Sequence, residues 1–314
     1  MTTARGLTRR ELLAAGAVAA GTLAVPVLLS RADSGKPNLD PVPDDDLRRI
    51  EAALPQRVTV KPTGPRRLLL FYRCEGFVHS SINRCNAALE MMGKATGAYE
   101  TIVSKGMKVF DPVFLSEFDA ILFNNTTRLA FEEPRHREAL MEYVRGGGGL
   151  CGIHAATDNF YDWPEAAEMM GGLFDGHPWG AGGNWAVQVE EPSHPLNGAF
   201  AGRGFWVNDE IYKIKAPYSR QRQRILLGLD MTKSENRPGR PDGDNAIAWI
   251  RQLDEGRVFY SALGHNHHVF WTPEVLRHYL DGIQFAMGDL PADATPSALL
   301  ESKPTICPAP DVST

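Results

Sequence analysis

Four consecutive glycines at 146–149, followed by an apolar run that ends at Ile153 and by His154, constrain the fold more than any other stretch of the chain. Glycines directly after a helical pattern end the helix and let the chain turn tightly. An apolar run this short, bounded by turn residues, is typical of a strand that is buried on both faces. We therefore predict a central strand over 150–153, with His154 at its carboxyl end.

The same alternation of short apolar runs and helical patterns extends along the chain. We expect strands over 67–73, 99–103, 120–124 and 150–153, with helices over 80–93 and 134–145. Strands and helices in turn, with short connections, predict a parallel sheet wrapped by helices. Later in the chain the pattern changes to short strands, expected over 185–190, 223–229, 246–250 and 257–261, before a closing helix over 273–287. The sequence thus predicts one α/β domain over 66–290, a parallel sheet flanked by helices with a β-rich elaboration.

The N-terminus has the features of a twin-arginine-type signal peptide over 1–32. Arg9 and Arg10 precede a run of alanine, glycine, valine and leucine that reaches Leu29, and small residues surround a cut site after Ala32. Export predicts a periplasmic or extracellular protein without a stable membrane span once the signal is removed. An uncleaved membrane anchor is the alternative, since the apolar run borders on spanning length.

Two further segments lie outside the predicted domain. Residues 33–65 contain several prolines and an acidic triplet at 44–46. This composition predicts a linker with at most a short helix over 47–54. Residues 291–314 are expected to form a C-terminal tail.

Charge and cysteine usage exclude several classes of function. The net charge of −5 gives no electrostatic basis for binding nucleic acid, so a small molecule is the expected partner. The four cysteines show no CxxC spacing, which argues against a zinc knuckle or a redox dithiol, and we expect free, buried thiols. A nucleophile elbow at Cys151 would need glycine two residues to either side, but Ile153 stands at the second position. Cys151 is therefore predicted to be a core residue.

The histidines and carboxylates that could carry chemistry follow expected strands. His79 follows the first strand, His154 and Asp158 follow the fourth, and His265 follows the strand over 258–263. The connecting loops add His177, His194, Asp209, Glu210 and Tyr212. Because parallel strands bring their carboxyl ends to one edge of a sheet, where ligands bind, we expect these side chains to converge.

Histidine titrates near neutral pH and suits proton transfer. We predict that His154 and His265 carry protons, and that Asp158, Asp209 and Glu210 orient them or act as the acid. Tryptophan rings can stack on sugar rings, although core packing is the alternative for each of the six. The predicted substrate-binding residues are His79, His177, Tyr212, Trp179 and Trp249.

No cofactor is predicted, and a divalent metal ion is the alternative. Imidazoles and carboxylates suit zinc, manganese or iron, and His154, His177 and His265 would be the ligands. Neither HExxH nor another compact ligand spacing is present. His267 and His268 are expected to belong to a polar loop before the closing helix.

Several short motifs occur together in a characteristic order. They are GIHAATD at 152–158, Trp163-Pro164, Gly176-His177-Pro178, His194-Pro195, DEIY at 209–212 and GRVFYSALGH at 256–265. In these motifs the chain resembles the ThuA-like family, the trehalose-utilisation type of domain, over about 67–290. The resemblance implies a flavodoxin-like sheet similar to that of class I glutamine amidotransferases.

The match to that wider group is incomplete. A cysteine occupies the elbow of the amidotransferases, whereas His154 matches the elbow here, so amidotransferase chemistry is not implied. Asp244-Asn245-Ala246 stands where the family often has a His-Pro pair. A ligand or base that relatives carry at that point would be missing from this chain.

The resemblance implies sugar metabolism, with keto-sugars or keto-glycosides made by a partner dehydrogenase as substrates. A carbonyl at C3 acidifies the C2 proton, so a histidine could remove it while an acid protonates the leaving oxygen. The outcome would be elimination, hydrolysis or isomerisation, as in a lyase, hydrolase or isomerase. A non-catalytic carbohydrate-binding domain and a metal-dependent hydrolase are the alternatives.

Overall fold

The computed structural model of the chain describes residues 39–233 and 239–311. The predicted signal peptide over 1–32 therefore lies outside the described residues. Within the two described ranges, no helix combines the length and the apolar character that a membrane span requires.

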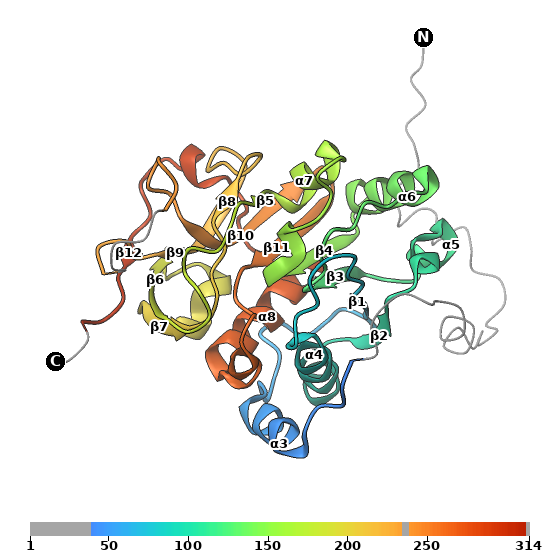
Figure 1. Ribbon diagram of the computed structural model, residues 1–314, viewed down its shortest axis with the longest axis horizontal. Coiled ribbons are helices and arrows are strands. Elements are labelled where there is room, and N and C mark those ends of the chain that lie inside the picture. The colour runs from blue at the N-terminus through green and yellow to red at the C-terminus, as the bar shows by residue number, and fades with distance from the viewer. Residues whose placement is uncertain (1–38, 234–238, 312–314) are drawn as a thin grey trace, which may run out of the picture.

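Five parallel strands form one half of a ten-stranded sheet within the described residues (Figure 1). Their order is β2-β1-β3-β4-β11, and each neighbouring pair is parallel. The bounds are β1 (Arg67–Phe71), β2 (Glu100–Ser104), β3 (Ala120–Asn124), β4 (Gly149–Ile153) and β11 (Gly256–Ser261). This is the strand order of flavodoxin-like sheets, so the predicted α/β fold is confirmed.

The β-rich elaboration continues the same sheet in the antiparallel sense. Next to β11 come β10 (Ala246–Leu253), β9 (Arg224–Leu229) and β6 (Asn184–Glu190), and the far edge of β6 pairs with β7 (Phe205–Asn208) and β12 (Ile306–Cys307). The whole sheet is therefore mixed: the expected parallel sheet forms one half of it, and the β-rich elaboration forms the other half. A separate two-stranded sheet joins β5 (Leu173–Phe174) to β8 (Ile214–Lys215).

Helices cover both faces of the sheet. In Figure 1, α4 (Ile82–Thr96) and α8 (Pro273–Ala286) lie below it, and α6 (Pro134–Arg145) and α7 (Pro164–Met170) lie above it. The shorter elements are α5 (Pro112–Leu115), η1 (Met107–Phe110), η2 (His154–Thr157), η3 (Pro195–Phe200), η4 (His267–Trp271) and η5 (Ser297–Leu299).

The glycine run places β4 tightly between its neighbours. Gly146 ends α6 by donating its N–H to the Glu142 carbonyl, and Gly147 has a φ of 104° that favours glycine. At Gly149 a Cβ atom would lie 2.5 Å from the Ala286 carbonyl oxygen at the end of α8. The missing side chain therefore lets α8 approach the strand that leads to His154.

The segments expected to be a linker and a tail belong in part to the folded domain. Helix α3 (Asp44–Ala53) packs on α4 and η4, and its Ile50 is fully buried. Arg84 on α4 forms an ion pair of 2.7 Å with Asp46. The described part of 291–314 adds β12 to the sheet and buries Ala309. The short helix expected over 47–54 is present as α3, and it packs on α4 and η4 instead of lying free in a linker.

Candidate functional site

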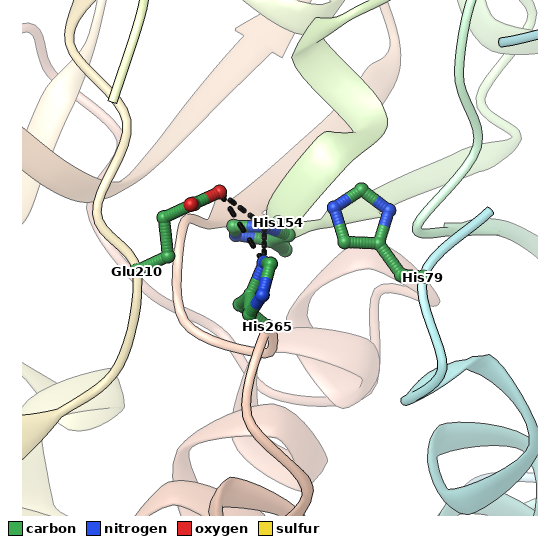
Figure 2. Close-up of side chains that lie close together, drawn as sticks. All are labelled: His79, His154, Glu210 and His265. Carbon is green, nitrogen blue, oxygen red and sulfur yellow. Dashed lines mark hydrogen bonds and ion pairs between the residues drawn. The ribbon is translucent and has the colours of Figure 1, made fainter. Parts of the chain in front are cut away.

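Three histidines and one glutamate converge at the carboxyl edge of the parallel strands. His154 follows β4, His265 follows β11, His79 lies between β1 and α4, and Glu210 lies between β7 and β8. Figure 2 shows the four side chains gathered around a common point. One nitrogen or oxygen atom from each lies within 4.8 Å of those of the others. We call His79, His154, Glu210 and His265 the histidine centre.

Three of these atoms form a triangle of nearly equal sides. His265 Nδ1 lies 3.2 Å from Glu210 Oε1 and 3.3 Å from His154 Nε2, and the latter two atoms are 3.7 Å apart. A point equidistant from all three corners lies about 2.0 Å from each, and zinc binds nitrogen and oxygen at about 2.0–2.2 Å. The triangle therefore has the dimensions of a first coordination sphere.

Two hydrogen bonds fix the ring and the backbone of His154. Its Nδ1 lies 2.8 Å from the Ala262 carbonyl oxygen, and as the donor in that bond it leaves the lone pair of Nε2 facing the centre. The Tyr260 hydroxyl donates to the His154 carbonyl at 2.7 Å. His154 also has a φ of 47°, a left-handed conformation that residues other than glycine adopt at a cost and that concentrates at functional sites.

The charges of the centre favour a cation. Burial keeps the pKa of His154 well below its usual value and lowers the pKa of His79 to about 3, so both rings are neutral at pH 7. Burial would raise the pKa of Glu210, but the hydrogen bond from His265 and the charge of that ring lower it. Burial would lower the pKa of His265, but Glu210 outweighs this and raises it. His154 and His79 therefore offer neutral imidazole nitrogens to a cation, and Glu210 offers a carboxylate.

His79 belongs to the centre, although it was expected only to bind substrate. Its side chain is buried, and its Nδ1 has no hydrogen-bond partner among the described residues. Its ring lies edge-on to those of His154 and His265, with centroids 4.9 and 5.2 Å apart. His79 thus takes the place in the possible ligand set that sequence reasoning assigned to His177.

His177 and Tyr212 border the centre. His177 Nδ1 lies 3.3 Å from Glu210 Oε2, and the His177 side chain is 55% exposed. The Tyr212 ring is buried, and its centroid lies 4.3 Å from the centroid of the His154 ring. Glu210 therefore contacts His154 and His265 through Oε1, and the exposed His177 through Oε2.

Asp209 positions the loop that carries His265. Its two carboxylate oxygens accept the backbone N–H groups of Gly264 and Asn266, each at 2.7 Å, and the residue is fully buried. Neighbouring residues of an extended segment point in opposite directions, so Asp209 lies beneath the loop while Glu210 enters the centre. Asp209 is thus a positioning residue.

Asp209→Asn should change how stability depends on pH. Burial raises the Asp209 pKa from 3.8 to about 7. Protonation of Asp209 stabilises the folded state, and this stabilisation is fully present below pH 3.8 and is lost as the pH rises through about 7. The free energy of unfolding of the native protein, relative to that of the variant, should therefore fall between pH 4 and pH 8 in chemical denaturation.

The exposed Asp254 offers a matched control, because Asp254→Asn should leave this pH dependence unchanged. A positioning role further predicts that Asp209→Asn weakens any metal binding at the centre by about 10- to 100-fold. Parallel stability curves for the native protein and Asp209→Asn would contradict the assignment.

Asp158 lies apart from the predicted proton carriers. It accepts a hydrogen bond from the Tyr161 hydroxyl and lies 3.3 Å from Arg128 Nε. Burial raises its pKa. In the described part of the chain these contacts direct Asp158 toward the loop after β3, not toward either imidazole that it was expected to orient.

The two tryptophans expected to bind substrate are fully buried. Trp249 stacks on Tyr260 with ring centroids 4.2 Å apart, and its indole donates to the Met170 carbonyl. The Trp179 indole N–H has no partner among the described residues. The structure does not bring either ring to the surface of the centre, and both pack in the core.

Other candidates also lie elsewhere. His194 Nε2 lies 3.1 Å from the Asp293 carbonyl, and His267 Nε2 lies 2.9 Å from Ser80 Oγ. All four cysteines are free, and Cys151 is fully buried, with a pKa raised by burial. The sequence did not predict that the Ala262 carbonyl orients His154, because every residue has a backbone carbonyl and residue type therefore does not mark this role.

The fold and the centre define an α/β protein with a histidine-rich site at the carboxyl edge of a flavodoxin-like sheet. The family model described as ThuA, trehalose utilisation, matches residues 67–286, and the chain belongs to this family. The family resemblance seen in the motifs is therefore confirmed, and with it a relation to sugar metabolism.

Two solved structures have the same fold. A ThuA-like protein from Bacteroides uniformis has a TM-score of 0.59 and 19% identity, covering 72% of this chain and 93% of its own. One from Parabacteroides merdae has a TM-score of 0.54 and 16% identity, covering 77% of this chain and 95% of its own. No curated protein matches the chain.

Proposed function

We propose that this protein is a metal-dependent enzyme that processes sugars carrying a carbonyl group, either keto-sugars or keto-glycosides. One observation carries the proposal: His154 Nε2, Glu210 Oε1 and His265 Nδ1, atoms of the kind that bind zinc, lie about 2.0 Å from a common point in a histidine-rich site. The family's description, trehalose utilisation, supports a sugar as the substrate.

The histidine centre would hold a metal ion, and the neighbouring His177 would move a proton. A divalent ion there would supply Lewis-acid polarisation of the substrate's carbonyl oxygen. His79, His154, Glu210 and His265 would hold it. His177, exposed to solvent and held by Glu210 Oε2, would accept the acidified C2 proton. The electron pair left at C2 can then form a C1–C2 double bond while the glycosidic oxygen leaves C1 and takes a proton from the protonated His177 or from water, which is elimination. If C2 instead takes back a proton and no group leaves, the outcome is isomerisation.

A second candidate keeps the imidazoles as the proton carriers. Nε2 of the neutral His154 would be the base, and His265, whose pKa Glu210 raises, would be the acid. The observation that favours it is the 3.3 Å contact between the two rings, which suits proton transfer. The two candidates differ in whether turnover needs a metal ion.

Metal removal should separate the candidates. Protein purified without chelators should contain about one divalent ion per chain by elemental analysis, because one triangle of ligands is present. Dialysis against a chelator should abolish conversion of a 3-keto-glucoside, and zinc or manganese should restore it. Full turnover by metal-free protein would support the second candidate. Sugar binding without any product would instead favour a carbohydrate-binding domain.

The proposed substrate also places the reaction in a sequence. A keto-sugar arises by oxidation of a sugar hydroxyl, so a sugar dehydrogenase must act first. Together with the signal peptide expected over 1–32, this extends the proposal to a step outside the cytoplasm. Cell fractionation checks the location.

A further inference from the structure

An aromatic side chain lies exposed beside the histidine centre. Phe77 is 66% exposed, and its ring lies edge-on to that of His79, with centroids 4.8 Å apart. The other exposed large apolar side chains in the described part of the chain are Val113, Leu299 and Ile306. None of these three is aromatic, and they lie on α5, η5 and β12, outside the centre. Phe77 is thus an exposed apolar ring next to the proposed reaction site.

The backbone around Phe77 is fixed against the loop after β3. Glu75 donates its N–H to the Thr127 carbonyl at 2.8 Å, and the Thr127 hydroxyl donates to the Phe77 carbonyl at 2.7 Å. At Gly76 a Cβ atom would lie 2.5 Å from Cγ of Arg128, so the two loops approach closely. A binding group whose backbone is already held in place loses little conformational entropy when a ligand arrives. The loop therefore presents the Phe77 ring in a preorganised position.

Phe77 and His177 contact different members of the histidine centre. His177 Nδ1 lies 3.3 Å from Glu210 Oε2, and the Phe77 ring lies against that of His79. Figure 2 shows Glu210 and His79 on opposite sides of the other two side chains. A ligand bound over the centre would therefore have the proposed proton acceptor on the Glu210 side and the Phe77 ring on the His79 side.

A sugar ring has two faces that suit this arrangement. In a glucose-type pyranose the hydroxyl groups point outward around the rim of the ring, so both faces consist mainly of C–H bonds. Aromatic side chains stack on such apolar faces. The C2 proton that the proposed reaction removes lies on one face. The opposite face is then free to stack on Phe77 while the first face turns toward His177.

We infer that Phe77 selects a pyranose ring in the substrate by stacking on the face opposite the C2 proton. The inference rests on the proposed function, which places C2 and the neighbouring carbonyl at the histidine centre. Trp179 and Trp249, the rings expected from the sequence to bind substrate, are buried in the core. An open-chain sugar offers no flat face to Phe77, so the protein would favour cyclic over open-chain ligands.

Substitution of Phe77 tests the inference where the fold should tolerate it, because the side chain is exposed. Phe77→Ala should weaken the binding of methyl glucoside about fivefold in calorimetry, the scale of one stacked ring. Phe77→Leu keeps an apolar side chain but has no flat ring, so it should lose as much affinity. Phe77→Trp should retain or strengthen binding, and its indole fluorescence should change when methyl glucoside is added.

Two controls separate stacking from other effects. Val113→Ala removes an exposed apolar side chain on α5, outside the centre, and should leave sugar affinity unchanged. Sorbitol has sugar hydroxyl groups but no ring, so it should bind the native protein more weakly than methyl glucoside, and Phe77→Ala should remove the difference. Elemental analysis should find native metal content in Phe77→Ala. Loss of metal from this variant would mean that the ring only positions His79, which would overturn the inference.

Binding and kinetics together separate this inference from the proposed reaction. For a 3-keto-glucoside, Phe77→Ala should raise KM about fivefold with kcat unchanged, because the stacking acts equally on bound substrate and transition state. If methyl glucoside affinity falls as expected while no keto-sugar is converted, the role of Phe77 stands and the proposed reaction fails. If Phe77→Leu binds methyl glucoside as tightly as the native protein, or if the native protein binds no sugar, the inference is overturned.

Discussion

Replacing His154 with asparagine should reduce kcat/KM for a 3-keto-glucoside by about 10³-fold or more. Loss of Nε2 removes one corner of the ligand triangle, and Lewis-acid stabilisation is worth several kcal/mol, or several factors of ten in rate. Elemental analysis should find the purified variant depleted of metal, and steady-state kinetics should give the rate.

Asparagine is chosen so that the loss does not come from misfolding. It tolerates the left-handed backbone found at this position, where φ is 47°. Its amide N–H₂ can also stand in for the Nδ1–H group that faces the Ala262 carbonyl. The thermal midpoint should therefore change little.

His268→Asn is the matched control, because His268 lies in η4, outside the histidine centre. It should retain native activity and metal content. If His154→Asn kept its metal and its turnover, the histidine centre would not be the reaction site.

The convergence of His154 and His265 could be predicted because it depends on the order and direction of buried strands. A short apolar run after glycines predicts β4, a second run predicts β11, and the two strands are parallel neighbours. Their carboxyl ends must then lie close together. This geometric argument uses only features that periodicity reveals.

Side-chain direction in irregular segments could not be predicted in the same way. His79 and His177 both follow short loops, but one is buried in the centre and the other is 55% exposed. Asp209 and Glu210 are adjacent carboxylates with opposite orientations, and their roles depend on where the loop at 264–266 lies. No hydrophobic period exists in such loops from which to infer burial.

The direction of β10 and the exposure of the aromatic side chains could not be predicted either, for a related reason. The apolar run of β10 looks like that of a parallel strand, because both are buried on both faces, yet β10 is antiparallel to β11. Tryptophan suits both a core and a sugar platform, so residue type alone did not separate Trp249 in the core from Phe77 at the surface.

Gly149→Ala should destabilise the fold by about 3 kcal/mol, near the upper end of the usual cost of overpacking. The new Cβ would lie 2.5 Å from the Ala286 carbonyl oxygen and 2.9 Å from Ala120 Cβ, so backbone at the end of α8 must move. Because β4 is hydrogen-bonded to β3 and β11, it has little freedom to shift in response. The thermal midpoint should fall by roughly 6–12 °C in a calorimetric or circular-dichroism melt.

Gly198→Ala provides the comparison that isolates this steric effect. Gly198 lies in η3, where a Cβ would meet nothing within 4 Å, so alanine should change the free energy of unfolding by no more than about 0.5 kcal/mol. The contrast between two identical substitutions would show that the close approach of α8, and not glycine's backbone freedom, requires glycine at 149. Equal melting temperatures for the two variants would mean that α8 can move away from β4 without lowering the free energy of unfolding.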